Sequence, residues 1–326
     1  MYYVNLGTAG IKVSRVALGC LTFGAKKWRP WVLEEEDAVP LIKRALDSGV
    51  NFFDTADFYS LGASEEILGR ALKRLGVPRH RVVISSKVAL PVGDDPNERG
   101  LSRKHIRHAL EATLHRLGVD YLDLYQMHRF DPDTPMDETI AALDEVVRRG
   151  QALYLGASSM HAWQFARLLA RCDAKGAARF STMQSHYNLV YREEEREMIP
   201  LCVAEGVGVL PWSPLARGFL AGTRGAGGES VRAKTDDIAQ RFYTHESDNA
   251  VLARVTDIAR RRGVSNAQVA LAWLMRQPGV VAPLIGVTKA EHIDDACAAV
   301  ELKLEAEEMK SLAGAYRPHP VIGHHQ

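Results

Sequence analysis

Residues 81–128 hold two apolar runs, RVVISSK (81–87) and YLDLYQMH (121–128), on either side of the helical pattern SRKHIRHALEATLHRL (102–117). Each apolar run is short and rich in branched or aromatic residues, which is typical of a strand buried on both faces. The helical pattern is followed by Gly118, and glycine is the residue best suited to the left-handed position that ends a helix. The stretch therefore predicts two parallel strands joined by a helix.

Six further apolar runs continue the alternation with helical patterns such as Glu34–Ser48 and Asp137–Arg149. With the two runs above they give the predicted strands Val16–Cys20, Asn51–Asp54, Arg81–Lys87, Tyr121–His128, Ala152–Ser158, Phe180–Ser185, Val207–Trp212 and Val280–Gly286. Strict alternation favours parallel pairing, and eight such units predict the α/β class and a closed (β/α)₈ TIM barrel. We expect a single domain over residues 1–326, with an N-terminal β-hairpin and a C-terminal helix and tail.

The longest irregular stretch, 219–247, follows the seventh predicted strand and contains the Gly-rich run 222–228. In a barrel, the loop after a strand lies over the active face, so this stretch is a candidate loop over the cofactor and substrate. A plain surface loop is the alternative interpretation.

Charge and composition exclude several classes of protein. The 41 Lys and Arg nearly balance the 40 Asp and Glu, for a net charge of +1, so bulk charge gives no reason to expect nucleic acid or a membrane surface as a partner. The four cysteines lie far apart, which fits neither a disulfide framework nor a metal site, and we expect no bound metal. No secretion signal is apparent at the start and no run reaches the ~20 apolar residues of a membrane span. These features predict a cytoplasmic protein and leave its oligomeric state open.

Ionisable residues stand at the ends of successive predicted strands. The second strand ends in Asp54, and Tyr59 follows a few residues later. The third strand ends in Lys87 and the fourth in His128. In a barrel of this type the carboxyl ends of the strands meet around the active site, so these side chains are predicted to converge.

These residue types support proton donation to a carbonyl group. A tyrosine phenol is a weak acid at neutral pH, and we expect the Lys87 ammonium to lower the pKa of Tyr59 while Asp54 pairs with the lysine. A neutral histidine can donate a hydrogen bond to the substrate oxygen. Because the sequence has neither a nucleophile motif nor a metal cluster, a hydride from a nicotinamide cofactor is the usual partner for such an acid.

The sequence has no Rossmann or P-loop fingerprint, so the phosphates of a dinucleotide need other contacts. The segment PWSPLARG at 211–218 and the turn GVTK at 286–289 carry backbone amides, hydroxyls and cations that suit this role. A helix beginning near Lys289 would add its N-terminal dipole.

At these residues the chain resembles the aldo-keto reductase superfamily, and the resemblance covers essentially its whole length. The motif NFFDTADFY at 51–59 is similar to the family signature that joins the aspartate to the tyrosine, and Lys87 and His128 stand where the other two catalytic residues belong. The resemblance implies a barrel that binds NADPH or NADP⁺ across the carboxyl ends of its strands. It implies Tyr59 as the general acid, Asp54 and Lys87 as the pair that tunes it, and His128 as a donor to the carbonyl.

The resemblance also implies cofactor contacts. Ser158, Ser159 and Gln184 correspond to the residues that hold the nicotinamide carboxamide, and Trp212 to the aromatic residue that stacks on the nicotinamide. The resemblance also places Ser213, Leu215 and Arg217 beside the pyrophosphate. It places the segment after the eighth strand, with Gly286, Thr288, Lys289 and His292, beside the adenosine 2′-phosphate. Ala296 replaces an asparagine common in the family, so the preference for NADP(H) over NAD(H) stays open.

Three residues are candidates for substrate contacts. Trp28 and Trp31 lie in the loop after the first strand, where they would form an apolar wall or simply pack within the loop. Arg129 follows the fourth strand and would bind a phosphorylated or carboxylated substrate, or pair with Asp131 or Asp133.

The predicted function is NADP(H)-dependent reduction of an aldehyde or ketone, with a small carbonyl or alcohol compound as partner. The alternative is an NADP(H)-binding regulatory subunit that senses redox state, resembling the channel-associated β subunits of the superfamily, with little turnover. Within the superfamily, GASSMHA at 156–162, YREEEREM at 191–198 and YRPHPV at 316–321 resemble bacterial reductases of the 1-deoxyxylulose-5-phosphate synthase-like group. These stretches indicate kinship and not a substrate.

Overall fold

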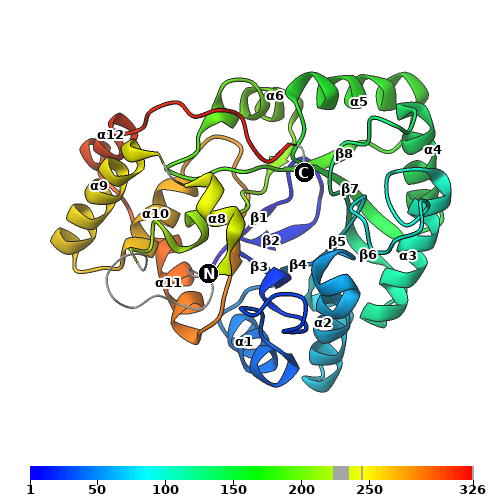
Figure 1. Cartoon of the computed structure of the whole chain (residues 1–326), viewed down its shortest axis with the longest axis horizontal. Helices are drawn as coiled ribbons and strands as arrows, with labels where there is room; N and C mark the ends of the chain where they lie inside the picture. The colour runs from blue at the N-terminus through cyan, green and yellow to red at the C-terminus, as the bar shows by residue number, and fades with distance from the viewer. Residues whose placement is uncertain (223–234, 244, 325–326) are drawn as a thin grey trace.

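The computed structural model describes residues 1–222, 235–243 and 245–324. Its centre is a ring of parallel strands (Figure 1), namely β3 Ala17–Gly19, β4 Phe52–Asp54, β5 Val83–Val88, β6 Leu122–Met127, β7 Ala152–Ser158, β8 Phe180–Gln184, β9 Gly208–Val209 and β10 Leu284–Gly286. Neighbouring strands pair in the order β10-β3-β4-β5-β6-β7-β8-β9. Chain order and spatial order therefore agree, and β10 returns to lie beside β3.

Backbone hydrogen bonds close the ring between β9 and the segment that leads into β10. The Val209 N–H donates to the Gly279 carbonyl, and the Val281 N–H donates to the Val209 carbonyl, both at 2.9 Å. The predicted (β/α)₈ barrel is therefore confirmed. Strands β9 and β10 are shorter than predicted because Pro211 and Pro283 have no N–H to donate to a neighbouring strand.

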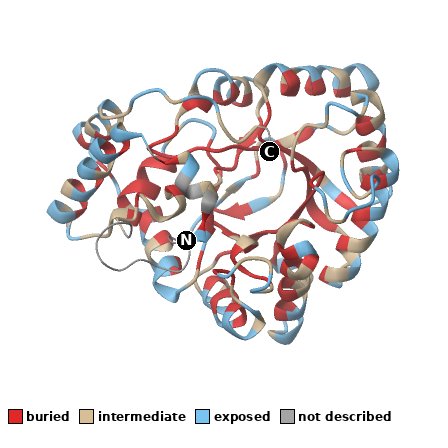
Figure 2. Ribbon diagram, in the orientation of Figure 1, coloured by how far each residue is buried: buried red, intermediate tan, exposed pale blue. Residues whose placement is uncertain are grey.

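Helices surround the ring and turn their buried faces toward it (Figure 2). They are α1 Glu35–Asp47, α2 Ala63–Arg74, α3 Arg103–Leu117, α4 Met136–Arg148, α5 Ala162–Lys175, α6 Met198–Glu205, α8 Asp237–Phe242, α9 Glu246–Arg262, α10 Asn266–Leu274, α11 Ala290–Glu301 and α12 Ala306–Gly314. Local sequence sets the ends of α3, since Ser102 Oγ accepts from the His105 N–H at 3.2 Å and Gly118 adopts a φ of 65°. In the described parts of the chain, none of the helices is both long and apolar enough to cross a membrane.

An N-terminal hairpin covers the end of the barrel where the strands begin. The predicted N-terminal β-hairpin is therefore confirmed. Strands β1 (Tyr3–Asn5) and β2 (Lys12–Ser14) pair antiparallel. Leu6 and Val13 from the hairpin pack in one apolar cluster with Phe52 and Leu124 from the barrel strands. This end of the barrel is therefore filled by apolar side chains.

Arg15 ties the start of the barrel to its last strand. The buried guanidinium donates to the backbone carbonyls of Val280 at 2.7 Å and Val281 at 2.8 Å, and also to that of Met275. These carbonyls replace the water that the N–H groups lose on burial.

The C-terminal tail returns from α12 to the centre of the molecule (Figure 1). There the Ile322 N–H donates to the Tyr191 hydroxyl at 3.0 Å. The His324 Nε2 lies 3.0 Å from Glu194 Oε1, and both side chains are buried. The tail is thus attached to the loop that follows β8.

The predicted loop over the active face, 219–247, is described in part. Residues 223–234 and 244 lie outside the described residues. The remainder includes α8, whose residues Arg241 and Phe242 line the cavity at the carboxyl ends of the strands.

Candidate active site

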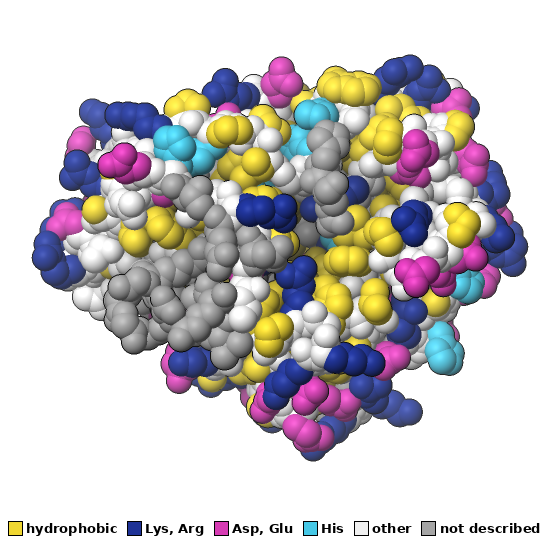
Figure 3. All heavy atoms as spheres, in the orientation of Figure 1, with side chains coloured by type: hydrophobic (Ala, Val, Ile, Leu, Met, Phe, Trp, Pro, Cys, Tyr) yellow, Lys and Arg dark blue, Asp and Glu magenta, His cyan; other side chains and the backbone are white. Residues whose placement is uncertain are grey.

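A cavity of about 1230 Å³ lies at the carboxyl ends of the barrel strands. Figure 3 shows this face hollowed near its centre, with Lys and Arg side chains beside the hollow. The predicted site residues that line the cavity are Trp28, Trp31, Asp54, Tyr59, His128, Arg129, Ser158, Gln184, Trp212, Ser213, Leu215, Arg217, Gly286, Thr288, Lys289 and His292. Lys87 and Ser159 lie just behind this lining, each bonded to a residue in it. The structure therefore brings the predicted residues together in one place.

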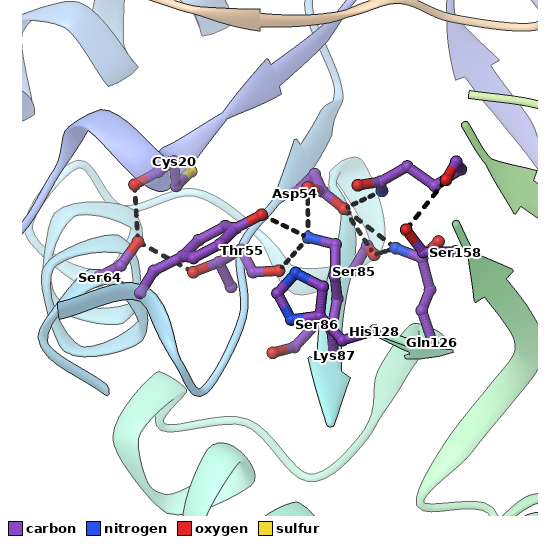
Figure 4. A network of polar contacts seen from close by, with 12 residues as sticks. Cys20, Asp54, Thr55, Ser64, Ser85, Ser86, Lys87, Gln126, His128 and Ser158 are labelled. Atoms are coloured by element: carbon purple, nitrogen blue, oxygen red, sulfur yellow. Dashed lines mark hydrogen bonds and ion pairs between the residues drawn. The ribbon is translucent and has the colours of Figure 1, made fainter. Parts of the chain in front are cut away.

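Lys87 is fully buried and makes three hydrogen bonds. Its Nζ donates to Asp54 Oδ2 at 2.6 Å, to the Thr55 carbonyl at 2.7 Å and to the Tyr59 hydroxyl at 3.2 Å (Figure 4). Burial alone would lower the pKa of Lys87, but attraction to Asp54 and Tyr59 outweighs it and raises that pKa. Lys87 therefore carries its positive charge at neutral pH.

Asp54 accepts further hydrogen bonds on its other carboxylate oxygen. Oδ1 accepts from Ser85 Oγ at 3.1 Å, Gln126 Nε2 at 3.0 Å and Gln184 Nε2 at 3.1 Å (Figure 4). Together with Lys87, these donors compensate a buried carboxylate and fix its orientation. Ser85 and Gln126 were not predicted as site residues. Each is a polar residue inside a largely apolar strand, and this position could have indicated a role in the site.

Tyr59 precedes a strained turn at the cavity wall. Ser60 and Leu61, which follow it, both have a φ of 51°, a left-handed conformation that costs about 1–2 kcal/mol for residues with a side chain. Burial raises the pKa of the Tyr59 phenol, while the Lys87 ammonium acts in the opposite direction. The lysine acts in the predicted direction, but burial, which the sequence does not show, outweighs it and the net shift of the Tyr59 pKa is upward.

His128 faces Tyr59 edge to face, with ring centroids 5.7 Å apart. Burial lowers the pKa of His128 well below its usual value, and the charges of Lys87 and Arg129 act in the same direction. The imidazole is therefore neutral at neutral pH and can donate one hydrogen bond without carrying a charge. Tyr59 and His128 border the same part of the cavity, where both can donate to one oxygen atom.

Trp212 is fixed by a stack of rings and by one hydrogen bond. The His186 imidazole lies between the Trp212 indole and the Tyr191 phenol, with centroid distances of 4.2 Å and 4.1 Å. Burial lowers the pKa of His186 well below its usual value, and its Nε2 lies 2.6 Å from the Tyr243 hydroxyl. The Trp212 Nε1–H donates to Ser159 Oγ at 2.9 Å. His186 was not predicted, because its partners come from distant parts of the chain.

Two of the remaining predicted cofactor contacts, Arg217 and Lys289, place positive charge at the cavity. Arg217 forms a buried ion pair with Asp236, with 2.6 Å between Nη1 and Oδ2, which fixes the position of the guanidinium. Lys289 is exposed and precedes α11, so its charge adds to the positive end of the helix dipole. Among the described residues, no group of three or more His, Cys, Asp or Glu side chains is arranged to hold a metal ion.

Comparison with known proteins agrees with this geometry. The Aldo/keto reductase family model matches residues 15–317. The chain belongs to this family. Versiconal hemiacetal acetate reductase from Aspergillus parasiticus is 44% identical, and the match covers 98% of each chain. Two proteins named putative aryl-alcohol dehydrogenase are also similar. The one from Schizosaccharomyces pombe is 42% identical over 98% of this chain and 97% of its own, and the one from Saccharomyces cerevisiae is 39% identical over 97% of each.

Aromatic side chains form one wall of the cavity in this aldo/keto reductase. Trp28 meets Trp31 edge to face at 6.5 Å between centroids, and it meets Phe58 in the same way at 5.9 Å. Phe58 in turn lies 6.5 Å from the ring of His128. Phe58 was not predicted, although it immediately precedes Tyr59, and it connects the two tryptophans to the catalytic end of the cavity.

The C-terminal tail of the reductase also reaches the cavity, which was not predicted. The tail residues in the lining are Val321, Ile322, Gly323 and His324. The His324 ring packs edge to face on His161 with centroids 4.8 Å apart. At Gly323 an added Cβ would come within 3.1 Å of the Trp212 ring, so the backbone itself lies against the indole. The apolar pair Val321 and Ile322 in an otherwise polar tail was the only signal in the sequence.

Proposed function

We propose that this aldo/keto reductase reduces aldehydes or ketones to alcohols with NADPH, and that Tyr59 is the general acid. The observation that carries the proposal is the Tyr59 hydroxyl, which lies 3.2 Å from a buried lysine and borders the same part of the cavity as the neutral His128. Similarity to a protein named putative aryl-alcohol dehydrogenase supports aromatic carbonyl compounds as one substrate class, and similarity to a hemiacetal acetate reductase supports the direction of reduction.

The proton for the carbonyl oxygen comes from Tyr59. Because burial raises the pKa of the phenol, the hydroxyl keeps its proton at neutral pH until the oxygen gains negative charge. The Lys87 ammonium then stabilises the phenolate that remains, and Asp54 keeps the lysine in place. His128 donates a hydrogen bond to the same oxygen. In the reverse direction the phenolate takes up the proton of an alcohol.

The cofactor, when bound, supplies the hydride that adds to the carbonyl carbon. At the nicotinamide end, Gln184 donates its amide N–H to Asp54, which leaves its carbonyl oxygen to accept from a carboxamide. Trp212 offers a fixed aromatic face for the ring. The residues proposed for the rest of the cofactor are Ser158, Ser159, Ser213, Leu215, Arg217, Gly286, Thr288, Lys289 and His292.

Removing the hydroxyl of Tyr59 tests the proposal. We expect Tyr59→Phe to lower kcat for benzaldehyde by about 10²- to 10⁴-fold, the usual contribution of a general acid, with NADPH affinity nearly unchanged. The measurement is NADPH consumption at saturating cofactor, with NADPH binding followed by fluorescence. Tyr121→Phe, which changes a tyrosine outside the cavity lining, is the control and should retain wild-type turnover. Equal turnover by Tyr59→Phe and wild type would show that another group is the acid.

The same assay, run with NADPH and NADH over a panel of aldehydes, tests the regulatory-subunit alternative and the cofactor preference. Tight NADPH binding without turnover of any aldehyde would favour the regulatory-subunit alternative. A preference for NADPH would support the proposed contacts at Lys289 and His292. The single-domain boundaries, the role of loop 219–247, the bacterial subgroup and the cytoplasmic location stay predictions.

A further inference from the structure

Arg129 lies in the wall of the catalytic end of the cavity with most of its donors unused. Its Nη1 donates to the His128 carbonyl at 2.6 Å, while its buried Nε–H has no partner. No carboxylate in the described ranges pairs with it. A guanidinium has five N–H donors, and a buried Nε–H without an acceptor is unfavourable. The side chain is therefore arranged to receive an anion.

Of the two carboxylates predicted as alternative partners of Arg129, that of Asp131 is engaged elsewhere. Asp131 Oδ2 accepts from the Leu101 N–H at 2.7 Å and from the Thr134 hydroxyl at 2.6 Å. Its Oδ1 accepts from the Asp133 N–H at 2.9 Å, within the same loop. No ion pair joins Arg129 to Asp131 or Asp133 in the described part of the chain, and the Asp131 carboxylate instead accepts hydrogen bonds from backbone and hydroxyl groups.

Three other cations in or beside the cavity lining have acidic partners. Lys87 pairs with Asp54, Arg217 with Asp236 and Lys26 with Glu34 at 3.8 Å. Arg129, by contrast, has no carboxylate partner in the described residues, so its charge beside Tyr59 is uncompensated. Burial lowers the pKa of Arg129 only to about 10, so the group stays positively charged at neutral pH.

The position of Arg129 indicates where its anion would lie. It directly follows His128 at the end of β6, and its charge adds to the lowering of the His128 pKa and partly opposes the rise of the Tyr59 pKa. Phe58 and Trp28 border the same part of the cavity with their rings edge to face. An anion bound to Arg129 is therefore close to the reacting carbonyl and beside an aromatic wall.

We propose that Arg129 binds an oxyanion carried by the substrate, so that the preferred substrates are carbonyl compounds with a carboxylate or a phosphate group. A planar aldehyde acid fits the aromatic wall and the guanidinium together. This inference rests on the proposed reductase function and specifies its substrate class. Carboxylate and phosphate share the geometry that a guanidinium binds through two parallel N–H groups.

A pair of substrates that differ in charge and by one methyl group tests the inference. We expect the wild-type kcat/KM for 4-carboxybenzaldehyde to exceed that for its methyl ester, methyl 4-formylbenzoate, by about 10-fold or more. Arg129→Gln should lower the value for the acid by about 10- to 100-fold and leave that for the ester within about 3-fold. Arg129→Lys should lie between the two. Glyceraldehyde 3-phosphate against glyceraldehyde repeats the comparison for phosphate.

Arg29→Gln is the matched control, because Arg29 also lines the cavity but lies over the rings of Trp28 and Trp31. It should leave the ratio of acid to ester unchanged. An equal loss for both substrates in Arg129→Gln would overturn the inference and assign Arg129 to the electrostatics of Tyr59 and His128. A wild-type enzyme that does not favour the acid would overturn it even if the variant fails to fold.

Binding without turnover separates this inference from the proposed function. Calorimetric titration with 4-methylbenzoate and with methyl 4-methylbenzoate should show tighter binding of the anion by wild type, and a loss of that difference in Arg129→Gln. If no aldehyde is reduced but the anion binds through Arg129, the proposed function fails and the anion site stands. If aldehydes are reduced and the anion does not bind, the reverse holds.

Discussion

The ends of strands β4 to β6 and the region after β8 and β9 position their functional side chains by different means. At β4 to β6, Lys87 and Asp54 are held by hydrogen bonds from several directions in a buried network. After β8 and β9, Trp212 is held by stacking on His186 and by a single hydrogen bond. A buried network of charges fixes the position of each atom, and removing one member leaves an unpaired charge that lowers stability strongly. A stack fixes only the plane of a ring, so the loss of one hydrogen bond beside it should have a small effect.

Removing the lysine should have the largest effect. Lys87→Met leaves the buried Asp54 carboxylate without its cation and Tyr59 without a charge to stabilise its phenolate. We expect the rate of aldehyde reduction to fall by about 10²- to 10⁴-fold. We also expect the free energy of unfolding to fall by about 3–5 kcal/mol. Aldehyde-dependent NADPH consumption and urea unfolding measure the two effects.

Lys104→Met, at an exposed position of α3, is the control for Lys87→Met and should resemble wild type in both measurements. If Lys87→Met is as stable as wild type, the charged network is no more sensitive to the loss of one member than the ring stack, and the proposed contrast is wrong.

The pH dependence of stability should reveal the histidine in the stack. Because burial lowers the pKa of His186 well below its usual value, the unfolded chain binds a proton below about pH 6.5 that the folded chain does not bind. The neutral His186 therefore costs no stability above about pH 6.5. Below that pH the free energy of unfolding falls as the pH drops, by up to about 1.4 kcal/mol per pH unit. His128 contributes with the same sign.

His186→Phe keeps a ring in the stack but removes its titration. We expect the free energy of unfolding to fall less between about pH 7 and about pH 5 in this variant than in wild type, as urea unfolding at each pH would show. Other titrating groups act equally on both proteins and cancel in the difference. Parallel curves would mean that His186 is not held neutral by its burial.

The smallest effect should come from the hydrogen bond that supplements the stack. Ser159→Ala leaves the Trp212 Nε1–H without its acceptor while the stacked rings stay in place. We expect the Kd for NADPH to rise by about 5-fold, which corresponds to about 1 kcal/mol, with kcat nearly unchanged. Ser311→Ala on α12 is the control, and NADPH fluorescence is the measurement. A loss of about 100-fold or more would show that Ser159 does more than orient the indole.

The same contrast explains what the sequence predicted and what it did not. Asp54 and Tyr59 stand in one short motif, and Lys87 and His128 end apolar runs, so local patterns were enough to predict their positions. The stack depends on His186 meeting rings from other loops, and the tail contact depends on a long return from α12. Such contacts leave no periodic signal. The upward net shift of the Tyr59 pKa was missed for a related reason, since the burial that outweighs Lys87 is a property of the folded chain.

The hydrogen bonds of Arg15 have a consequence for the order of folding. Its acceptors at Val280 and Val281 lie 265 and 266 residues further along the chain. During synthesis Arg15 is therefore made long before the segment that completes the ring. The inner faces of the early strands therefore stay exposed until late in translation. Closure of this barrel cannot precede the synthesis of Val281, and the unclosed chain exposes apolar strand faces until then.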